Sequence, residues 1–437
     1  MKYTVTYQFI GLNVLIKPGL ILLTFICLAS CASQKERRFE KKVTRALSER
    51  DFDDHFTGLM VYDPITGDTL IGVNSDKYFT PASNTKIFTL YTSLKILPDS
   101  VPSLKYVAQN DTLYFTGTGD PSAMHPYFQD SSSIRFMKGF KTLVYVNGLF
   151  EEDRFGPGWA WEDYDSAFSP ERSALPLYGN VISIFNDNAL SVIPDYFKDS
   201  VKLKTSSIKR FEDGNKFYFD PKRADTTQVP FKNSTALTKS LLEGAVGASV
   251  LLGDSFPVSD RKILYSISSD SLYRYMMQDS DNFIAEQLLI IASAVLTDTL
   301  SGAMTRDYIL DTYLAGLSHR PRWVDGSGLS RYNLFTPGSM IYVLKALYKE
   351  IPKKRLFTLF PAGGISGTLE EWYNGDPEPY VFAKSGTLGN NYCLSGYILT
   401  KKGKTLIFSF MNNHFMEPTS AIKTQIEQVL ETIRDSY

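Results

Sequence analysis

The sequence predicts an α/β protein of the α+β kind, in which a β-rich domain is inserted into a domain of helices and strands. Both ends of the chain show strand-like alternation, over residues 56–73 and 379–413. Apolar residues recur at helical spacing after Pro81 and throughout residues 281–296. Short strands, turns and aromatic residues fill residues 101–231. A chain of 437 residues is long enough for a split domain with a domain-sized insertion.

The first thirty residues form a segment of their own. The short apolar run "GLILLTFICLAS" follows Lys17 and Pro18 and leads into "LASC", which ends at Cys31. This pattern predicts export with a signal peptide over residues 1–30. It resembles the bacterial lipoprotein signal, in which the cysteine is lipidated, becomes the mature N-terminus and anchors the chain to a membrane. A transmembrane anchor, or secretion with an incidental cysteine, are the alternatives.

Few cysteines remain after such processing. The mature chain would keep Cys393 as its one unlipidated cysteine, so an intrachain disulfide framework is impossible. We expect Cys393 to lie buried in a strand and the core to supply the stability.

The remaining elements follow in order. Residues 33–50 predict a charged amphipathic helix or a tether, and residues 56–73 predict two strands around a turn at Pro64. The helix after Pro81 then enters a core. The predicted organisation is a signal peptide over residues 1–30, a main domain over residues 31–100 and 232–437, and an inserted β-rich domain over residues 101–231.

The resumed main domain contains further helices and strands. Helical spacing returns in residues 233–247, and residues 281–296 predict a buried helix. The longest fully apolar stretch of that helix is too short to span a bilayer. Strands over residues 379–413 and an amphipathic C-terminal helix complete the chain.

Composition argues against several classes of function. The formal net charge of −1 argues against a nucleic-acid partner, which normally needs a basic face. The four histidines are scattered without metal-ligand spacing, so we expect structural or surface roles for them and no metal. The glycines of "GTGDP" predict a turn, because a phosphate loop needs a longer pattern and a following helix. We expect no cofactor.

Ser83 and Lys86 lie three residues apart at the start of an apolar helix, so their side chains share one face. A serine hydroxyl becomes a good nucleophile when a neighbouring base takes its proton. A lysine can act as that base only when it is neutral, and its free pKa is near ~10.4. Burial, the positive end of the helix and a second cation each lower that pKa.

The Ser-x-x-Lys spacing alone carries little information, because it also occurs at Ser206, Ser259 and Ser420. The Ser206 pair lies in polar sequence and the Ser259 pair in a loop. The Ser420 pair opens an amphipathic helix, from which Lys423 can point to water. Ser83 differs because the sequence after it is predominantly apolar.

Two further motifs follow Ser83 along the chain. "SDN" at 280–282 opens the buried helix, and "KSGT" at 384–387 lies on a strand. Ser-x-x-Lys, Ser-Asp-Asn and Lys-[Thr/Ser]-Gly, in this order, form the motif set of penicillin-binding proteins and serine β-lactamases.

Each motif has a chemical task. The Ser280 hydroxyl can relay a proton between base and leaving group, and the Asn282 carboxamide can orient a substrate amide. Lys384 supplies the nearby cation, and the hydroxyls of Ser385 and Thr387 can bind a carboxylate. We predict a site for acyl transfer.

The chain resembles the low-molecular-mass class C penicillin-binding proteins, the D-alanyl-D-alanine carboxypeptidase/endopeptidase family, over most of its mature length. The 197 residues from Ser83 to Ser280 exceed the compact connection of class A β-lactamases and agree with the insertion of this family. The third motif is Lys-Ser-Gly rather than the commoner Lys-Thr-Gly, and the hydroxyl is kept. The segments that carry the resemblance are "FTPASNTKIFTLYTSL", "TGTGDPS", "GPGWAWEDY", "SDNFIAEQLL", "VDGSGLSRYNLFTP", "FPAGGISGTL" and "AKSGTLGN".

The resemblance implies a fold and a reaction. The fold is the penicillin-binding/β-lactamase-like transpeptidase fold, an antiparallel sheet flanked by helices. Ser83 would attack the carbonyl between two D-alanines, or a D-amino-acid cross-link of peptidoglycan, with Lys86 as general base. The backbone N–H groups of Ser83 and Thr387 would form the oxyanion hole. β-Lactam antibiotics would be covalent inhibitors.

Two alternatives remain, a serine β-lactamase and a non-catalytic penicillin-binding scaffold. Class A β-lactamases deacylate with a glutamate on a loop between the second and third motifs. Glu370 and Asn374 have the matching spacing but lie too close to the third motif. We therefore expect penicillin to remain on Ser83. The complete motif set argues against a scaffold.

The sequence does not decide the role of a few other residues. Asp325, Ser327 and Arg331 in "DGSGLSR" could shape the site or fix a turn. We expect Trp159 and Trp161 to anchor packing rather than to bind substrate.

Overall fold

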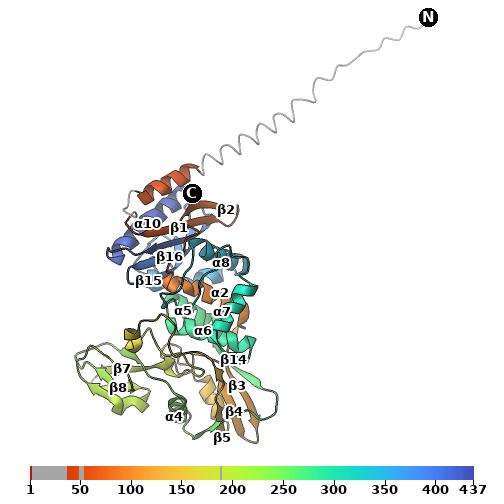
Figure 1. Cartoon of the computed structure of the whole chain (residues 1–437), viewed down its shortest axis with the longest axis vertical. Helices are drawn as coiled ribbons and strands as arrows, with labels where there is room; N and C mark the ends of the chain where they lie inside the picture. The colour runs from red at the N-terminus through yellow and green to blue at the C-terminus, as the bar shows by residue number, and fades with distance from the viewer. Residues whose placement is uncertain (2–36, 49–53, 188) are drawn as a thin grey trace.

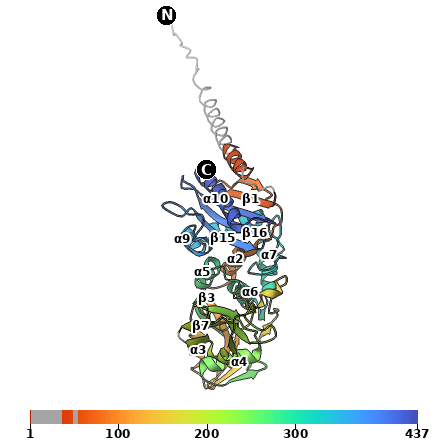
Figure 2. The same cartoon turned by 90° about the vertical axis from the view of Figure 1, so that its left-hand side faces the viewer.

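The structure is a computed structural model, and it describes residues 1, 37–48, 54–187 and 189–437. Figures 1 and 2 show two parts along the long axis, with the red helix of residues 37–48 and the blue C-terminal elements in one part and the yellow-green middle of the chain in the other. Within the described residues, no helix combines the length and the apolar character that crossing a membrane requires. The predicted signal peptide and Cys31 lie outside the described residues.

The main domain is built on an antiparallel sheet that joins the two ends of the chain. Asp63 shapes the first turn, because its Oδ1 accepts the N–H of Ile65 at 2.8 Å. The strands, in the order in which they pair, are β15 (Val381–Leu388), β16 (Asn391–Leu399), β17 (Thr405–Asn413), β1 (Phe56–Asp63) and β2 (Asp68–Val73).

Helices cover both faces of this sheet, as the resemblance predicts. Every residue of β17 is buried, and its alternate side chains Ile407 and Phe408 enter two different cores. One core contains α2 (Lys86–Ile96), α6 (Asn282–Leu296) and α8 (Pro337–Glu350). The other contains α10 (Thr419–Ser436) and the helix of residues 37–48.

The helix of residues 37–48 is part of the main domain. Phe39 and Val43, spaced one helical turn apart, are buried in the same core as α10. The sequence was compatible with either a helix or a tether in this segment, and the structure shows a packed helix.

The buried helix α6 begins at the predicted motif. The Asp281 side chain caps it by accepting the N–H of Ile284 at 2.7 Å, and every residue from Phe283 to Ala294 is buried. The neighbouring helices on this side of the sheet are α5 (Ser269–Gln278), α7 (Gly302–Thr312) and α9 (Lys353–Leu359), with the 3-10 turn η5 (Gly367–Leu369) before β15.

The second part of the chain contains a mixed sheet. Its β3–β4 and β3–β13 pairs are antiparallel, and its β4–β5 and β5–β12 pairs are parallel. In pairing order the strands are β12 (Val250–Gly253), β5 (Thr142–Val146), β4 (Thr112–Gly117), β3 (Ser100–Gln109) and β13 (Lys262–Ser268).

Short elements complete this part. They include a three-stranded sheet, two two-stranded ladders, two helices and several 3-10 turns. Their bounds are β6 (Leu149–Phe150), β7 (Val181–Asp187), β8 (Ala189–Ile193), β9 (Val201–Leu203), β10 (Phe217–Phe219), β11 (Thr227–Pro230), β14 (Thr299–Leu300), α3 (Ser132–Met137), α4 (Thr235–Val246), η2 (Trp161–Asp165), η3 (Tyr178–Asn180) and η4 (Asp195–Ser200).

Elements after residue 231 pack and pair with the predicted inserted region. Leu241 and Leu242 of α4 share a core with Leu113 and Phe115 of β4, and β12 and β13 pair into the same sheet. A strand's partner is set by the tertiary fold and not by its own residues, so the sequence alone could not assign β12 and β13 to this sheet. We propose residues 101–268 as the inserted region.

Candidate active site

Ser83 lies in a 3-10 turn that leads directly into α2. The turn, η1, spans Ala82–Thr85, and Lys86 is the first residue of the helix. Ala82 has a φ of 48°, a left-handed conformation that costs a non-glycine residue on the order of 1 kcal/mol or more. The surrounding structure must therefore hold this turn in place.

Two glycines let other segments pack against the Ser83 turn. A Cβ on Gly386 of β15 would lie 2.7 Å from the Ser83 backbone nitrogen. A Cβ on Gly328 would collide with the carbonyl of Ala82. The strand with the third motif and the loop around Gly328 therefore lie directly on the backbone that carries Ser83.

Lys86 is fully buried, and its Nζ has three oxygen neighbours. Ser83 Oγ lies at 3.0 Å, Asn282 Oδ1 at 2.6 Å and the Ser327 carbonyl oxygen at 2.7 Å. The two carbonyl-type oxygens can only accept, so each takes one N–H of the amine. When the amine is neutral, its third position, which faces Ser83, carries the nitrogen lone pair. The geometry suits the transfer of a proton from Ser83 to Lys86.

Burial lowers the pKa of Lys86 to about 8. The negative charges of Asp281, Asp325 and Glu286 oppose this effect. The sequence predicted burial as a cause but not the three acidic groups. The resulting pKa leaves part of the lysine population neutral near pH 7.

The second motif contacts Lys86 through the side chain of Asn282. The Asn282 carboxamide also donates from Nδ2 to the Phe168 carbonyl at 3.0 Å, so both of its ends have protein partners. Ser280 is half-buried and has a φ of 60°, in the turn between α5 and α6. The structure thus adds a role for Asn282, holding the lysine, that the sequence did not suggest.

The third motif lies on β15, as predicted. Lys384 is buried, and its Nζ donates to the Ser385 carbonyl at 2.9 Å. The Ser385 hydroxyl donates to Thr368 Oγ1 at 2.7 Å, and the Thr387 side chain is exposed. One strand therefore presents a lysine and two hydroxyls beside the Ser83 turn.

The two buried lysines repel each other. The pKa of Lys384 lies well below its usual value because of burial first and the charge of Lys86 second, while Asp279 raises it. Low-dielectric surroundings disfavour two ammonium groups close together. Burial and three acidic groups, rather than Lys384, account for the pKa of Lys86. The expectation that Lys384 keeps Lys86 neutral stays a prediction.

Asp325 organises the loop that supplies the Ser327 carbonyl. Its carboxylate accepts the backbone N–H of Gly328 at 2.8 Å and that of Ser330 at 2.6 Å. It also accepts the indole N–H of Trp159 at 2.8 Å. The loop thus both forms a turn and shapes the site, so both interpretations left open for Asp325 and Ser327 hold.

Three other residues named in the sequence analysis have different surroundings. Trp161 is 74% exposed, so the expectation that it anchors packing is wrong. Arg331 is exposed at the end of the Asp325 loop, near Gly389. Cys393 is a buried, free cysteine of β16, as predicted.

Glu286 is a site neighbour that the sequence did not single out for this role. Its Oε1 accepts the Ser327 N–H at 2.7 Å, and its Oε2 lies 3.5 Å from Arg172, which also pairs with Glu152 at 2.7 Å. Burial first, and Asp325 second, raise the pKa of Glu286 to about 7. A glutamate inside a predominantly apolar helix is the sequence signal that could have indicated Glu286.

A serine and a buried lysine, beside a second lysine on an antiparallel sheet flanked by helices, define the class of serine-dependent penicillin-binding proteins. The model of the D-Ala-D-Ala carboxypeptidase 3 (S13) family matches residues 39–216 and 221–433. The chain belongs to this family, and the predicted resemblance is confirmed.

Individual relatives support this family assignment. The penicillin-sensitive carboxypeptidase A of Dictyostelium discoideum is 25% identical over 448 residues, covering 85% of this chain and 85% of that protein. A D-alanyl-D-alanine carboxypeptidase of an Actinomadura species is 23% identical over 457 residues, covering 90% and 84%.

Solved structures confirm the fold class. Penicillin binding protein 4 from Haemophilus influenzae has a TM-score of 0.68 at 19% identity, covering 90% of this chain and 97% of that one. A predatory peptidoglycan endopeptidase from Bdellovibrio bacteriovorus has a TM-score of 0.50 at 17% identity, covering 86% and 92%.

Proposed function

We propose that this protein is a serine D-Ala-D-Ala carboxypeptidase, a DD-endopeptidase or both, acting on peptidoglycan peptides through an acyl-enzyme on Ser83. Membership of the family supports the reaction class. The observation that carries the mechanism is the 3.0 Å contact of Lys86 Nζ with Ser83 Oγ, in the one direction of the amine that no carbonyl oxygen takes.

Acylation begins with proton transfer from Ser83 to Lys86. The Ser83 oxygen forms a bond to the carbonyl carbon, and the backbone N–H groups of Ser83 and Thr387 stabilise the oxyanion. The amide C–N bond then breaks, and Lys86, with Ser280 as relay, returns the proton to the leaving amine. The hydroxyls of Ser385 and Thr387 bind the carboxylate of the leaving residue, and the negative charge of that carboxylate favours the protonated form of Lys384 beside it.

Deacylation uses water. A water molecule attacks the ester carbon, the Ser83–carbon bond breaks, and Ser83 recovers its proton. Glu286 is buried and already accepts the Ser327 N–H, and Glu370 lies just after η5. In the sequence Glu370 lies too close to the third motif to match the glutamate of a class A β-lactamase, so we propose that a β-lactam stays on Ser83 as a stable adduct.

We also propose that the protein is exported and tethered by a lipid on Cys31. The cell-wall substrate of the proposed reaction lies outside the cytoplasm, and the apolar run before Cys31 matches a lipoprotein signal. Metabolic labelling with a palmitate analogue tests this tether. Label that is present in the wild type and lost in Cys31→Ala supports it, and label that persists in the variant contradicts it.

Labelling with a fluorescent penicillin tests the nucleophile. We expect a stable label in the wild type that is lost in Ser83→Ala, together with release of D-alanine from a peptide ending in D-Ala-D-Ala. Ser420→Ala is the matched control, because Ser420 has the same Ser-x-x-Lys spacing at the start of a helix but is exposed. Equal labelling of wild type and Ser83→Ala would contradict the proposal, and so would rapid penicillin turnover.

A further inference from the structure

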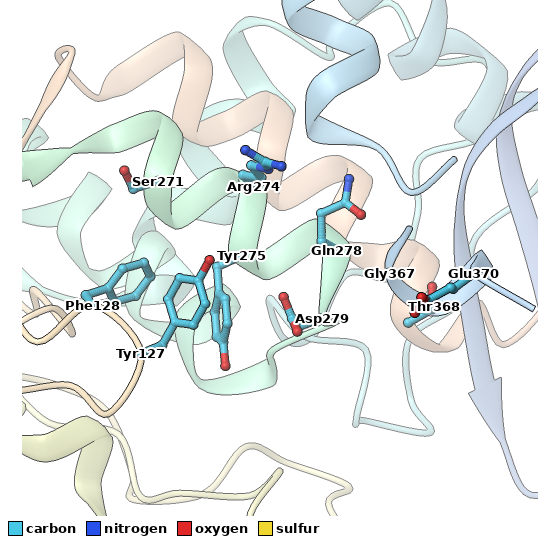
Figure 3. A pocket seen from close by; sticks show the side chains of 10 residues that line it. All are labelled: Tyr127, Phe128, Ser271, Arg274, Tyr275, Gln278, Asp279, Gly367, Thr368 and Glu370. Carbon is cyan, nitrogen blue, oxygen red and sulfur yellow. The ribbon is translucent and has the colours of Figure 1, made fainter. Parts of the chain in front are cut away.

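The inserted region contains a cavity that the proposed reaction does not use. The pocket beside the second and third motifs, whose lining Figure 3 shows, belongs to the proposed active site, because its Thr368 accepts the hydrogen bond of the Ser385 hydroxyl at 2.7 Å. The second cavity has a volume of about 310 Å³ and is lined mainly by residues of the inserted region. It therefore needs an explanation of its own.

This second cavity, the strand-edge pocket, lies at the carboxyl ends of three parallel strands. Thr116 lies near the end of β4, Asn147 directly follows β5, and Asp254 directly follows β12. Because β5 pairs in parallel with both β4 and β12, these three ends meet at one edge of the sheet. Open sheets with parallel strands bind ligands at this edge, where the loops that follow the strands converge. The position of the pocket thus indicates a ligand site.

The polar groups of the strand-edge pocket include one without a partner. Thr116 is 6% exposed, and its hydroxyl has no hydrogen-bond partner among the residues that the structure describes. Any side chain at Gly148 would cover this hydroxyl, because a Cβ there would lie 2.8 Å from Thr116 Oγ1. The side chains of Asn147 and Asp254 are exposed. A buried hydroxyl without a partner costs free energy, and a polar ligand can supply that partner.

The charged side chains of the lining balance one another. Lys105 and Arg261 both pair with Asp298, and the Lys105 contact measures 3.0 Å. Together with Asp254, the lining holds two cations and two anions, so its formal charge is zero. A pocket without net charge does not attract a phosphate or a nucleotide, and it suits a neutral polar ligand.

An aromatic ring completes the lining. Phe256 is half-buried in the loop after β12, and the Arg261 guanidinium lies 5.7 Å from the centroid of its ring. A sugar ring has an apolar face of C–H groups that can pack on an aromatic ring, and its hydroxyl and acetamido groups can bond to side chains such as Asn147 and Asp254. A volume of 310 Å³ lies at the small end of the roughly 300–1,000 Å³ of ligand pockets. It suits about one or two sugar rings.

We propose that the strand-edge pocket binds a neutral N-acetylated sugar of the peptidoglycan glycan strand and so holds the enzyme on its polymer. The inference rests on the proposed function, from which it takes the polymer. The pocket docks this polymer at a distance from acyl transfer. Asn282 begins α6 and Asp298 follows its end, and a helix of 15 residues is about 20 Å long. A peptide needs about six extended residues to span that length.

A second contact with the same polymer raises the effective concentration of stem peptides at Ser83. Titration calorimetry of the full-length protein with the tetramer of N-acetylglucosamine tests the pocket. We expect the wild type to bind the tetramer. Asn147→Ala, Asp254→Ala and Phe256→Ala should each raise the Kd by about tenfold or more, with a wild-type Tm.

Matched variants control for the loss of an exposed side chain from the inserted region. Phe211 and Asp213 are exposed and lie outside the strand-edge pocket, so Phe211→Ala and Asp213→Ala should keep the wild-type Kd. Co-sedimentation with purified sacculi gives a second readout. In the Ser83→Ala background, which prevents digestion, Phe256→Ala should leave several-fold less protein in the pellet, and the tetramer should release bound protein.

The outcomes separate this pocket from the proposed function. A wild type that does not bind the tetramer, or pocket variants that bind it as the wild type does, would overturn the pocket. Displacement of the tetramer by a sugar-free stem peptide would also overturn it, in favour of a peptide ligand. In each case penicillin labelling of Ser83 would leave the proposed function standing. Absence of that label and of D-alanine release would overturn the proposed function, whatever the tetramer does.

Discussion

The indole N–H of Trp159 donates to the Asp325 carboxylate across 2.8 Å, joining the inserted region to the loop that holds Lys86. Asp325 shapes that loop, and the Ser327 carbonyl of the same loop accepts from Lys86. The inserted region therefore contributes to the position of the general base, in addition to any role of its own.

Loss of the indole donor should slow acylation of Ser83. Trp159→Phe removes one of the hydrogen bonds to a buried carboxylate. Loss of such a donor raises the free energy of the buried acceptor by about 1–3 kcal/mol. We expect acylation by a fluorescent penicillin to slow about tenfold with a small change in Tm. Trp161→Phe, at a tryptophan that is 74% exposed, is the control and should match the wild type. Equal acylation rates for both variants would show that Asp325 does not depend on Trp159.

A methyl group at position 386 should damage the site. In Gly386→Ala the Cβ would lie 2.7 Å from the backbone atoms Pro81 O and Ser83 N, which cannot move aside as a flexible side chain can. We expect a loss of stability of about 1–3 kcal/mol and strongly reduced acylation. The control is Gly389→Ala, whose nearest neighbour is an Arg331 side-chain atom at 3.6 Å. Thermal unfolding and penicillin labelling of both variants measure the effect. A Gly386→Ala protein that labels like Gly389→Ala would contradict the close packing of β15 on the Ser83 turn.

Glu286 is one of three acidic groups that should raise the pH at which the site becomes active. Its negative charge raises the pKa of Lys86, so Glu286→Gln should lower that pKa, while the amide oxygen can still accept the Ser327 N–H. We expect the rise of the acylation rate with pH to shift to lower pH. Glu350→Gln is the control, because Glu350 pairs with Lys95 at the end of α8. A shift to higher pH would contradict the assigned sign.

Much of the site could be predicted from the sequence because its chemistry is local. Ser83 and Lys86 are one turn apart, and the apolar residues after them indicated burial of the lysine. The 280–282 motif opens an apolar helix, and the 384–387 motif lies in a strand, so each motif signalled its own element. The helices and strands of the main domain follow from the same periodicities.

The contacts that the sequence could not predict are backbone or long-range ones. The Ser327 carbonyl that holds Lys86 is a main-chain atom, which any residue could provide. Glu286 and Arg172 meet across 114 residues of chain. The pairing of β12 and β13 with β5 and β3 depends on the tertiary fold, so the sequence could not assign these two strands to the sheet of the inserted region.

The pH dependence of Ser83 acylation tests the central claim most directly, namely that neutral Lys86 is the base. The pKa of Lys86 is lowered to about 8, so protonation should switch the site off below that pH. Between about pH 6 and pH 10 the wild-type rate of penicilloyl-Ser83 formation, followed by quenched-flow mass spectrometry, should rise to a plateau above about pH 8. Lys86→Met should lose this rise and be slower by a factor of about 10²–10⁴. A wild-type rate that does not change with pH, or a Lys86→Met protein that keeps the wild-type profile, would contradict the account.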